Sequence, residues 1–433
     1  MLKIMTLSFL VINIYAQELE REDNHRERIH SVRDVVSGVL KTEEKELDIV
    51  SGFSHMFDDG TVSGQLRSMY SRYNYKDATN TYATALGGHL KYELASYKGF
   101  NGGVALTTSQ KVSTLSAKGT SFNDELTSSK GNYTQLSEAY VNYTFGDLAI
   151  RFGRQEVDTP LADTDDIRMT PNTFEAYLLR YTKDDFLFVG GLLKRFQGFD
   201  AGLDTNKAWQ TTGDKGTWIA GVTYDTSNIE GDLYYYDVSK SDASNTANGN
   251  VANTSIYLSV GGHVHFAQEH SIHLDSQFLQ QNEADASGVQ SVVYGFLFEY
   301  VFEGVGFNLA YNKSNKKQGK RTFSGFGGGT LFTSMDNMIL DNITSDRDAR
   351  GIVGGISYTF RDVNFLYAYG DFDGKADSSG VTQHIEEQDF GIEYMPNEEV
   401  TIASIYTKQD DKDQTGINGG SWENFRILVA YSF

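Results

Sequence analysis

The feature that most constrains this chain is a two-residue alternation of apolar and polar side chains that continues from residue 62 to residue 433. In "LSEAYVNYTF", for example, Val141 and Phe145 point to one face, while Glu138 and Asn142 point to the other. Successive side chains of an extended strand lie on opposite sides of the sheet. The alternation therefore predicts many strands, each with one apolar side and one polar side.

The connections between these strands alternate in length. Short links follow every second strand, at 98–99, 145–147, 182–185, 303–304 and 361–362. Long polar links fill the other gaps, at 114–131, 156–173, 197–215, 240–250, 316–349, 374–383 and 410–420. Counting on this basis gives about eighteen strands. Such a chain is typical of an all-β fold: a closed transmembrane antiparallel β-barrel of the bacterial outer membrane, with short periplasmic turns and long extracellular loops.

A soluble β-sandwich is the alternative to a barrel. A sandwich hides its apolar faces in a core, and a stretch of this length normally divides into several domains. No linker, repeat or change of composition divides residues 62–433. In a barrel the apolar face meets lipid and the polar face meets water, which explains a mean hydropathy of −0.41 in a membrane protein. The barrel is therefore favoured.

Two segments precede the predicted barrel of residues 62–433. Residues 1–16, "MLKIMTLSFLVINIYA", place a lysine before an apolar core and predict a secretory signal peptide. Residues 17–61 form a charged N-terminal periplasmic extension that we expect to be partly helical or disordered, with helical spacing in "IHSVRDVVSGVL". This extension is a solvated tail, a plug of the barrel or a helix that binds a partner.

The last strand carries a terminal signal. "ENFRILVAYSF" places Val429, Tyr431 and the terminal Phe433 on one face. An alternating apolar strand that ends in phenylalanine looks like the assembly signal of outer-membrane barrels. The barrel-assembly machinery is therefore a predicted partner.

Composition excludes several classes of function. The chain has no cysteine, so it has no disulfide framework and no thiol nucleophile. Its formal net charge of −21 argues against nucleic-acid binding, which needs a basic face. The sequence has no G-x-S-x-G, H-E-x-x-H or P-loop motif, and we predict no catalytic residue and no cofactor. An outer-membrane barrel enzyme would need a Ser–His or Asp–His pair near one rim.

Two groups of side chains offer metal ligands. His263 and His265 share a polar face, and a turn at 267–269 would set His273 opposite His263. Neighbouring imidazoles can bind a transition metal, but no carboxylate completes this set. The run "DTDD" at 163–166 clusters oxygens that suit calcium, but it lacks the spacing of an EF-hand. We predict no metal site, and leave open whether this acidic loop binds a cation.

The longest link carries a basic run and a glycine run. "KSNKKQGKR" at 313–321 either meets lipopolysaccharide phosphates or is a solvated charge run. "GFGGG" at 325–329 lacks the lysine of a P-loop, so we interpret it as a flexible hinge or as loop backbone.

The link "TPLADTDDIRMTPNTF" contains two of the three prolines in the chain, Pro160 and Pro171. Proline fixes φ and removes a backbone donor, so the segment neither extends the flanking strands nor forms a regular helix throughout. It lies between the predicted fifth and sixth strands and is the third long loop.

The run "LSEAYVNYTFGDLAIRFGRQEVDTPLADTDDIRMTPNTFEAYLLRY" resembles the corresponding region of OprD-type (Opr family) porins. "GQLRSMY" (64–70), "GHLKYELASYKGFNGGVAL" (88–106) and "FSGFGGGTLFTSMDNMILD" (323–341) resemble them too. The likeness extends over residues 62–433. It implies an eighteen-stranded barrel through which small solutes diffuse, with the third loop folded into the lumen.

The same resemblance implies which residues narrow the lumen. In that family, acidic and polar residues of the third loop face a ladder of basic side chains on the wall. Carried onto this chain, the constriction residues are Asp163, Asp165, Asp166 and Arg168, and the basic ladder is Arg67, Lys91, Arg151 and Arg180. An ion pair such as Arg168 with Asp165 would hold the loop in place.

The predicted function is passive or weakly selective diffusion of small hydrophilic solutes and ions through a constricted, water-filled lumen. The predicted partners are outer-membrane lipid, lipopolysaccharide and the solutes themselves, and the barrel is a homotrimer or a monomer. The alternatives are a barrel enzyme and a structural or adhesive barrel plugged by residues 17–61. The substrate stays open because inward acids and bases are mixed.

Overall fold

The computed structural model describes residues 49–202, 209–242, 249–266, 270–315 and 317–433. The predicted signal peptide (1–16) and most of the charged extension lie outside the described residues. Helical segments in the described part are α2 (Ile49–Asp58) and the short 3-10 turns η1 (Ser113–Leu115), η2 (Gly119–Ser121), η4 (Leu340–Ile343) and η5 (Ile417–Gly419).

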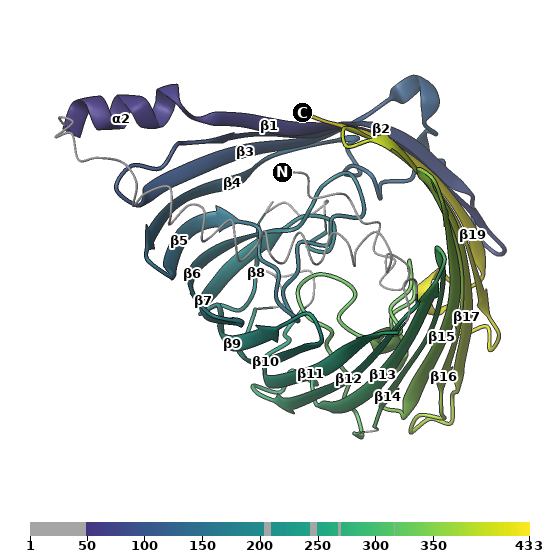
Figure 1. Cartoon of the computed structure of the whole chain (residues 1–433). Coiled ribbons are helices and arrows are strands. Elements are labelled where there is room, and N and C mark those ends of the chain that lie inside the picture. Colours follow the sequence, from purple (N-terminus) through teal and green to yellow (C-terminus); the bar gives the residue numbers. More distant parts are fainter. Residues whose placement is uncertain (1–48, 203–208, 243–248, 267–269, 316) are drawn as a thin grey trace.

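The strands of the described residues form one antiparallel sheet (Figure 1). The first half contains β1 (Thr61–Tyr75), β2 (Thr81–Glu93), β3 (Phe100–Lys111), β4 (Asn132–Phe145), β5 (Leu148–Gln155), β6 (Thr173–Lys183), β7 (Phe186–Gln197), β8 (Gln210–Thr211), β9 (Thr217–Asp225) and β10 (Ile229–Val238). The second half contains β11 (Asn253–His265), β12 (His270–Glu283), β13 (Ser291–Phe302), β14 (Val305–Ser314), β15 (Ala349–Phe360), β16 (Val363–Gly374), β17 (Gln383–Asn397), β18 (Val400–Asp411) and β19 (Trp422–Ser432).

The sheet closes because β1 pairs with β19. Their register runs from Gln65↔Ser432 to Tyr75↔Trp422. The terminal residue extends the seam, since Phe433 and Gly64 exchange two backbone hydrogen bonds of 3.0 Å. The two-residue strand β8 pairs with the end of β7, and β7 also pairs directly with β9. Without β8, eighteen of the nineteen strands in the described chain form the wall. The predicted closed antiparallel barrel of about eighteen strands is confirmed.

The burial of side chains in the wall is inverted relative to that of a soluble protein. On β1, Leu66 is 59% exposed on the outer face, whereas the adjacent Arg67 is 1% exposed on the inner face. On β4, Val141 and Phe145 are likewise exposed outward. An outer band of apolar side chains with polar groups inside is the arrangement of a barrel in a bilayer. The alternation of apolar and polar faces predicted from the sequence is confirmed.

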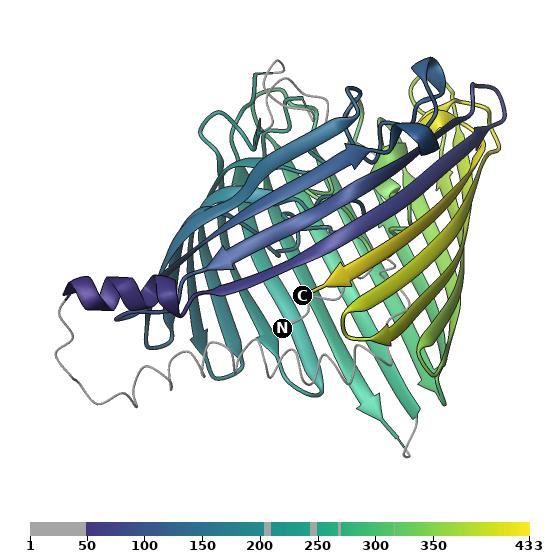
Figure 2. The ribbon, with the colours of Figure 1, turned by 90° about the horizontal axis from the view of Figure 1, so that it is seen from above.

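Most of the long connections lie at one end of the barrel and most of the short ones at the other, as Figure 2 shows. One end carries the links 94–99, 146–147, 184–185, 226–228, 266–269, 303–304, 361–362 and 398–399. The other end carries 76–80, 112–131, 156–172, 198–216, 239–252, 284–290, 315–348, 375–382 and 412–421. The segment 156–172, called the β5–β6 loop below, is therefore the third connection at the long-loop end, as predicted.

Helix α2 packs against the short-turn end of β2 and β3. The backbone N–H of Ala95 donates to the carbonyl of Met56 at 3.0 Å, and the Tyr92 hydroxyl donates to the carbonyl of Phe57. The Phe53 ring lies 6.2 Å from the ring of Tyr97, measured between centroids. The first described residues are thus attached to the rim of the wall.

Two long loops pair with each other by main-chain hydrogen bonds. The N–H of Asp163 donates to the carbonyl of Phe326 at 3.0 Å, and the N–H of Phe326 donates to the carbonyl of Leu161 at 2.9 Å. Phe326 belongs to the segment 315–348, called the β14–β15 loop below. The glycine run considered as a hinge in the sequence is therefore ordered loop backbone that docks on the β5–β6 loop.

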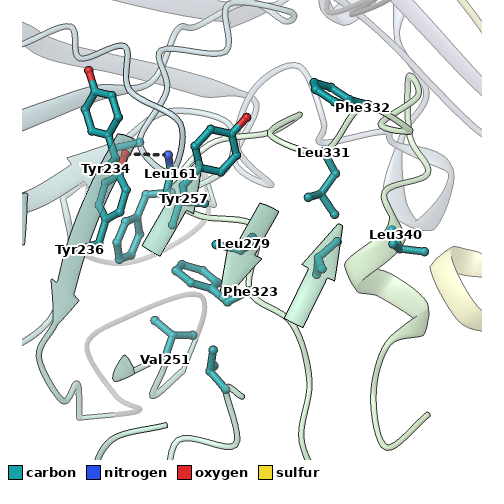
Figure 3. Close-up of a cluster of buried hydrophobic side chains, with 14 of the residues drawn as sticks. Leu161, Tyr234, Tyr236, Val251, Tyr257, Leu279, Phe323, Leu331, Phe332 and Leu340 are labelled. Carbon is teal, nitrogen blue, oxygen red and sulfur yellow. Dashed lines mark hydrogen bonds between the residues drawn. The ribbon is translucent and has the colours of Figure 1, made fainter. Parts of the chain in front are cut away.

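A hydrophobic cluster continues from this contact (Figure 3). It joins side chains of both loops to inward side chains of the wall, and its members include Leu161, Tyr236, Tyr257, Leu279, Phe323, Leu331 and Leu340. The N–H of Leu161 donates to the hydroxyl of Tyr236 at 3.1 Å. Burial of apolar groups on both loops explains why they pack against the wall, because each buried aliphatic side chain contributes about 1.5–3 kcal/mol.

Gly325→Ala should loosen the contact between the two loops. Gly325 has a φ of 112°, and a Cβ there would lie 2.6 Å from the carbonyl oxygen of Leu161. We expect a local cost of roughly 1–3 kcal/mol, seen as faster hydrogen–deuterium exchange over residues 156–172. Gly319→Ala is the matched control, because that glycine also has positive φ but a Cβ there meets nothing within 4 Å. Equal exchange in the two variants would contradict the close-approach explanation.

Candidate functional site

Arg67 is an inward side chain of β1 that holds the β5–β6 loop. Its guanidinium makes two hydrogen bonds to the carboxylate of Asp166, one of them 2.7 Å long from Nη1 to Oδ1. Nη1 also donates to the carbonyl oxygen of Arg168 at 3.0 Å. Bidentate arginine–carboxylate pairs fix orientation as well as charge. A predicted ladder residue and a predicted loop residue are therefore in direct contact.

Arg168, on the same loop, connects to charged groups from three other elements. Its Nε donates to Oε1 of Glu125 at 2.6 Å. Nη1 of Arg426, on β19, lies 3.3 Å from the same oxygen. Arg426 also forms an ion pair with Asp336, and Nη1 of Arg168 lies 4.0 Å from Oδ1 of Asp336. Two arginines and two acids thus tie together the loops at 112–131, 156–172 and 315–348 and the last strand.

Inward acids of β17 complete this network. The backbone N–H of Asp336 donates to Asp389 at 3.2 Å, and the N–H of Asn337 donates to Glu387 at 2.9 Å. The hydroxyl of Thr407, on β18, donates to the Asp336 carboxylate at 3.1 Å. Side chains of the wall therefore accept hydrogen bonds from the backbone of the β14–β15 loop. They do so at Asp336, the residue of this loop that pairs with Arg426.

The electrostatic environment holds Glu125 ionised. Burial alone would raise the pKa of this carboxyl, but the charges of Arg168 and Arg426 and a 2.9 Å hydrogen bond from Ser71 lower the pKa of Glu125 to about 2. The ordinary value is 4.5. Because the folded pKa lies below the ordinary one, the contact stabilises the fold above about pH 4.5 and is lost as the pH falls toward 2.

Asp163 and Asp165 have different surroundings from Asp166. The N–H of Asp165 donates to Oδ1 of Asp163 at 3.2 Å, in a turn where Asp165 has a φ of 37°. The Asp165 carboxyl hydrogen-bonds with Asp200, which also accepts a 2.6 Å hydrogen bond from Asn172. Burial and the charge of Asp165 raise the pKa of Asp200 to about 7. The predicted group of three aspartates is therefore divided between two sites.

The other predicted ladder residues lie nearer the short-turn end of the wall. The Lys91 ammonium is 3.1 Å from Glu138. Lys91 and Arg151 both approach the ring of Tyr140, at 5.3 Å and 4.3 Å from its centroid. Arg180 faces Ala149 of β5 in register. Arg67 contacts the β5–β6 loop directly, through the carboxylate of Asp166 and the carbonyl of Arg168.

Glu125, Asp336 and Arg426, which form ion pairs with each other or with Arg168 in this network, were not predicted from the sequence. Arg426 alternates with two apolar outward residues in the last strand, so its inward direction was readable from the period of two. Glu125 and Asp336 stand in long loops, where no periodicity indicates the direction of a side chain. Only the tertiary structure brings them to the arginines.

The histidines of β11 and β12 also come together. His263 lies opposite His273 in the register of the two strands, as predicted, and His265 lies opposite Ser271. The expectation that no carboxylate completes this set is wrong. Glu230, on β10, lies 3.2 Å from Nε2 of His273 and 3.8 Å from Nε2 of His263. The sequence does not show that Glu230 lies near these histidines, because that depends on the register between β10 and β11.

Metal-ligand spacing occurs at two places in the described part of the chain. The groups are Glu230, His263 and His273 in one place and Asp371, His384 and Glu386 in the other. The aspartates of the "DTDD" run, considered for calcium, are not among the groups with this spacing in the residues that the structure describes.

No helix among the described residues is long and apolar enough to cross a membrane.

Neither a protein-family model nor a curated protein matches the sequence. Solved structures match it over most of its length. OccK1 (OpdK) of Pseudomonas aeruginosa has 15% identity and a TM-score of 0.71, covering 87% of this chain and 99% of its own. OccAB2 of Acinetobacter baumannii has 14% identity and a TM-score of 0.73, covering 88% and 99%. A BenF-like porin of Pseudomonas fluorescens Pf-5 has 12% identity and a TM-score of 0.73, covering 87% and 99%. The chain shares the fold of these proteins.

Glu125→Gln should release the loop at 112–131 from the network. Removing one partner of a buried ion pair costs about 3–5 kcal/mol, and two arginines lose an anionic partner here. We expect faster hydrogen–deuterium exchange over 112–131 in the refolded protein, and the wild type should show the same loosening below about pH 3, as its Glu125 becomes protonated. The exposed neighbour Asp124, replaced by asparagine, is the control for the charge change. If both variants exchange equally, the ion pair does not hold the loop.

Asp200→Asn should remove the pH dependence of the contact between Asp200 and the β5–β6 loop. This contact weakens as the pH rises, whereas the contact of Glu125 weakens as the pH falls. Because the pKa of Asp200 is raised from 3.8 to about 7, its contact with the β5–β6 loop is strongest below about pH 4 and weakens as the pH rises to 7. Asparagine cannot ionise, so exchange of residues 198–202, corrected for intrinsic rates, should become independent of pH between 4 and 8. Asp214→Asn, an exposed acid of the same connection, should keep the wild-type slope. A wild type without any slope would rule out the raised pKa.

Proposed function

We propose that this protein is an outer-membrane channel through which small hydrophilic solutes and ions diffuse passively or with weak selectivity. The observation that carries the proposal is the closed eighteen-strand wall with an apolar outer face and charged side chains inside. Barrels of 16 to 18 strands are wide enough to leave an aqueous channel. The likeness in fold to outer-membrane channels supports the same function and the same location.

Several inward charges keep access to solvent inside the barrel, which supports a water-filled path. The side chain of Asp166 is 28% exposed, that of Lys91 is 22% exposed and that of Glu93 is 38% exposed. Charged groups in a narrow aqueous gap act on ions and dipolar solutes without tight binding. A path lined by both signs of charge suits small polar solutes better than one class of ion.

We place the constriction at the β5–β6 loop, with Asp163, Asp165, Asp166 and Arg168 as its charged residues. The contact of Asp166 with Arg67 supports this, because it sets an acid of the loop against a base of the wall. The network of Arg168, Glu125, Arg426 and Asp336 would fix the width of the gap. Lys91, Arg151 and Arg180 would then continue the basic ladder toward the short-turn end.

Asp166→Asn should shift the ion selectivity toward anions. The substitution removes a solvent-accessible negative charge and leaves Arg67 uncompensated. One unit charge acting over about 4 Å in water is worth about 1 kcal/mol, which changes the cation-to-anion permeability ratio by about fivefold. The measurement is the reversal potential of the refolded protein in a planar bilayer under a KCl gradient. Asp214→Asn, an exposed acid of the connection 198–216, is the control. The triple variant that replaces Asp163, Asp165 and Asp166 by asparagine should shift the reversal potential further than Asp166→Asn alone. An unchanged reversal potential in Asp166→Asn would exclude Asp166 from the constriction.

Planar-bilayer recordings also separate the channel from its rivals. A channel gives discrete conductance steps, and their absence from correctly folded protein would contradict the proposal. Deletion of residues 17–48 should leave the conductance nearly unchanged, whereas in a barrel plugged by that segment it would raise the conductance sharply. Hydrolysis of lipid or peptide substrates by the purified protein would instead favour a barrel enzyme.

A further inference from the structure

Glu230, His263 and His273 form a compact group on the inner wall, apart from the loop network. The three residues come from the adjacent strands β10, β11 and β12. All three point inward, because their neighbours Ile229, Val264 and Leu274 are exposed on the outer face. The group lies close to the short-turn end, where 266–269 connects β11 to β12. From this arrangement we infer that the three side chains bind one divalent transition-metal ion, with zinc or copper as the best match.

The spacing of the ligand atoms fits such an ion. One atom from each residue lies within 4.8 Å of the other two. The distances from Glu230 oxygens to Nε2 of His273 and of His263 are 3.2 Å and 3.8 Å. Ligands at the usual zinc distances lie about 3.3 Å apart in tetrahedral geometry. The rings of His263 and His273 are stacked, with centroids 4.0 Å apart and planes 12° apart, so one ring has to rotate for both nitrogens to bind the same ion. Two imidazoles and one carboxylate are borderline donors that suit zinc, copper or nickel better than calcium or magnesium.

A second carboxylate orients the more buried histidine. Oε2 of Glu299, on β13, lies 2.8 Å from Nδ1 of His273, and only 4% of the His273 side chain is exposed. Metal-ligating histidines commonly donate their other ring N–H to a carboxylate, which fixes the tautomer and raises the basicity of the ligand. Glu299 therefore leaves Nε2 of His273 as the nitrogen that faces Glu230. Glu299 thus orients a ligand of the proposed ion without binding the ion itself.

Because Gly261 has no side chain, a gap remains between His273, Asp275 and Glu230. A Cβ at this position would lie 2.9 Å from Nε2 of His273, 3.1 Å from Cγ of Asp275 and 3.3 Å from Cγ of Glu230. A side chain here would occupy the gap beside the ligand atoms. The Asp275 carboxyl adds a further negative charge next to the gap. Acids around the two imidazoles favour a cation there.

The second group with ligand spacing lacks these features. The side chains of His384 and Asp371 are 37% and 32% exposed. The third member, Glu386, forms an ion pair with Lys412 at 2.7 Å, so its carboxylate already has a cationic partner. We therefore assign the ion to the group on β10–β12, where it would join three adjacent strands. The other group provides the matched control.

Metal binding to the full-length refolded protein, prepared without a histidine tag, tests the assignment. Titration with Co²⁺ followed by visible absorption, and competition with Zn²⁺, should give one site per barrel with nitrogen ligands. His273→Asn and His263→Asn should each abolish that site. Glu299→Gln should weaken it by about 10–100-fold, as outer-shell changes do. His384→Asn, and replacement of His25 and His30 in the N-terminal extension, should leave affinity and stoichiometry unchanged.

Three results would overturn the assignment. The first is the absence of a stoichiometric Co²⁺ or Zn²⁺ site in folded wild-type protein, which would leave the group as a buried histidine–carboxylate ion pair. The second is binding that survives His263→Asn. The third is binding that disappears in His384→Asn. Should His273→Asn fail to fold, Glu230→Gln takes its place, because that side chain is 21% exposed and its replacement keeps the shape.

Discussion

The hydrogen bonds between the first and last strands are the constraint on which the rest of the molecule depends. A sheet edge in hydrocarbon leaves backbone N–H and C=O groups unpaired, at a cost of several kcal/mol for each group. The β1–β19 register removes both edges, and the exchange of hydrogen bonds between Phe433 and Gly64 carries the seam to the last residue. Closure also separates an inner face from an outer face, so alternating side chains point either into the barrel or outward. The proposed channel, its constriction and the metal site all lie on that inner face.

The inside of the barrel is organised by two kinds of interaction. Apolar side chains of the loops at 156–172 and 315–348 pack on inward residues of the wall and form one hydrophobic cluster. Beside it, Arg67, Arg168 and Arg426 pair with acids of three loops, which are Asp166 of 156–172, Glu125 of 112–131 and Asp336 of 315–348. The apolar cluster stabilises the packing of the loops by burying apolar surface. The buried ion pairs select one arrangement of the loops, because a buried charge without its partner is costly. Together they explain why long polar loops are fixed against the wall.

Sequence reasoning succeeded where the information is local. The period of two identified the strands and the direction of Arg67, and the lengths of the links identified the two ends of the barrel. It also set His263 opposite His273, because a tight turn fixes the register of a hairpin. It failed for Glu230, which stands on a neighbouring strand outside that hairpin, and for Glu125 and Asp336, which stand in loops. The aspartates at 163, 165 and 166 were treated as one group, yet the backbone turn at Asp165 directs them to different partners.

The sequence by itself determined an antiparallel barrel of about eighteen strands, with an apolar outer face and a charged inner one. Strand geometry makes each of these properties readable from residues close together in the chain. The tertiary structure alone decided which acid meets which base, which loops touch, and that a carboxylate of β10 completes a pair of histidines from β11 and β12. Those contacts join residues far apart in sequence, such as Glu125 and Arg426. Their distances depend on how the closed sheet curves and on how the loops pack within it, and no local pattern contains that information.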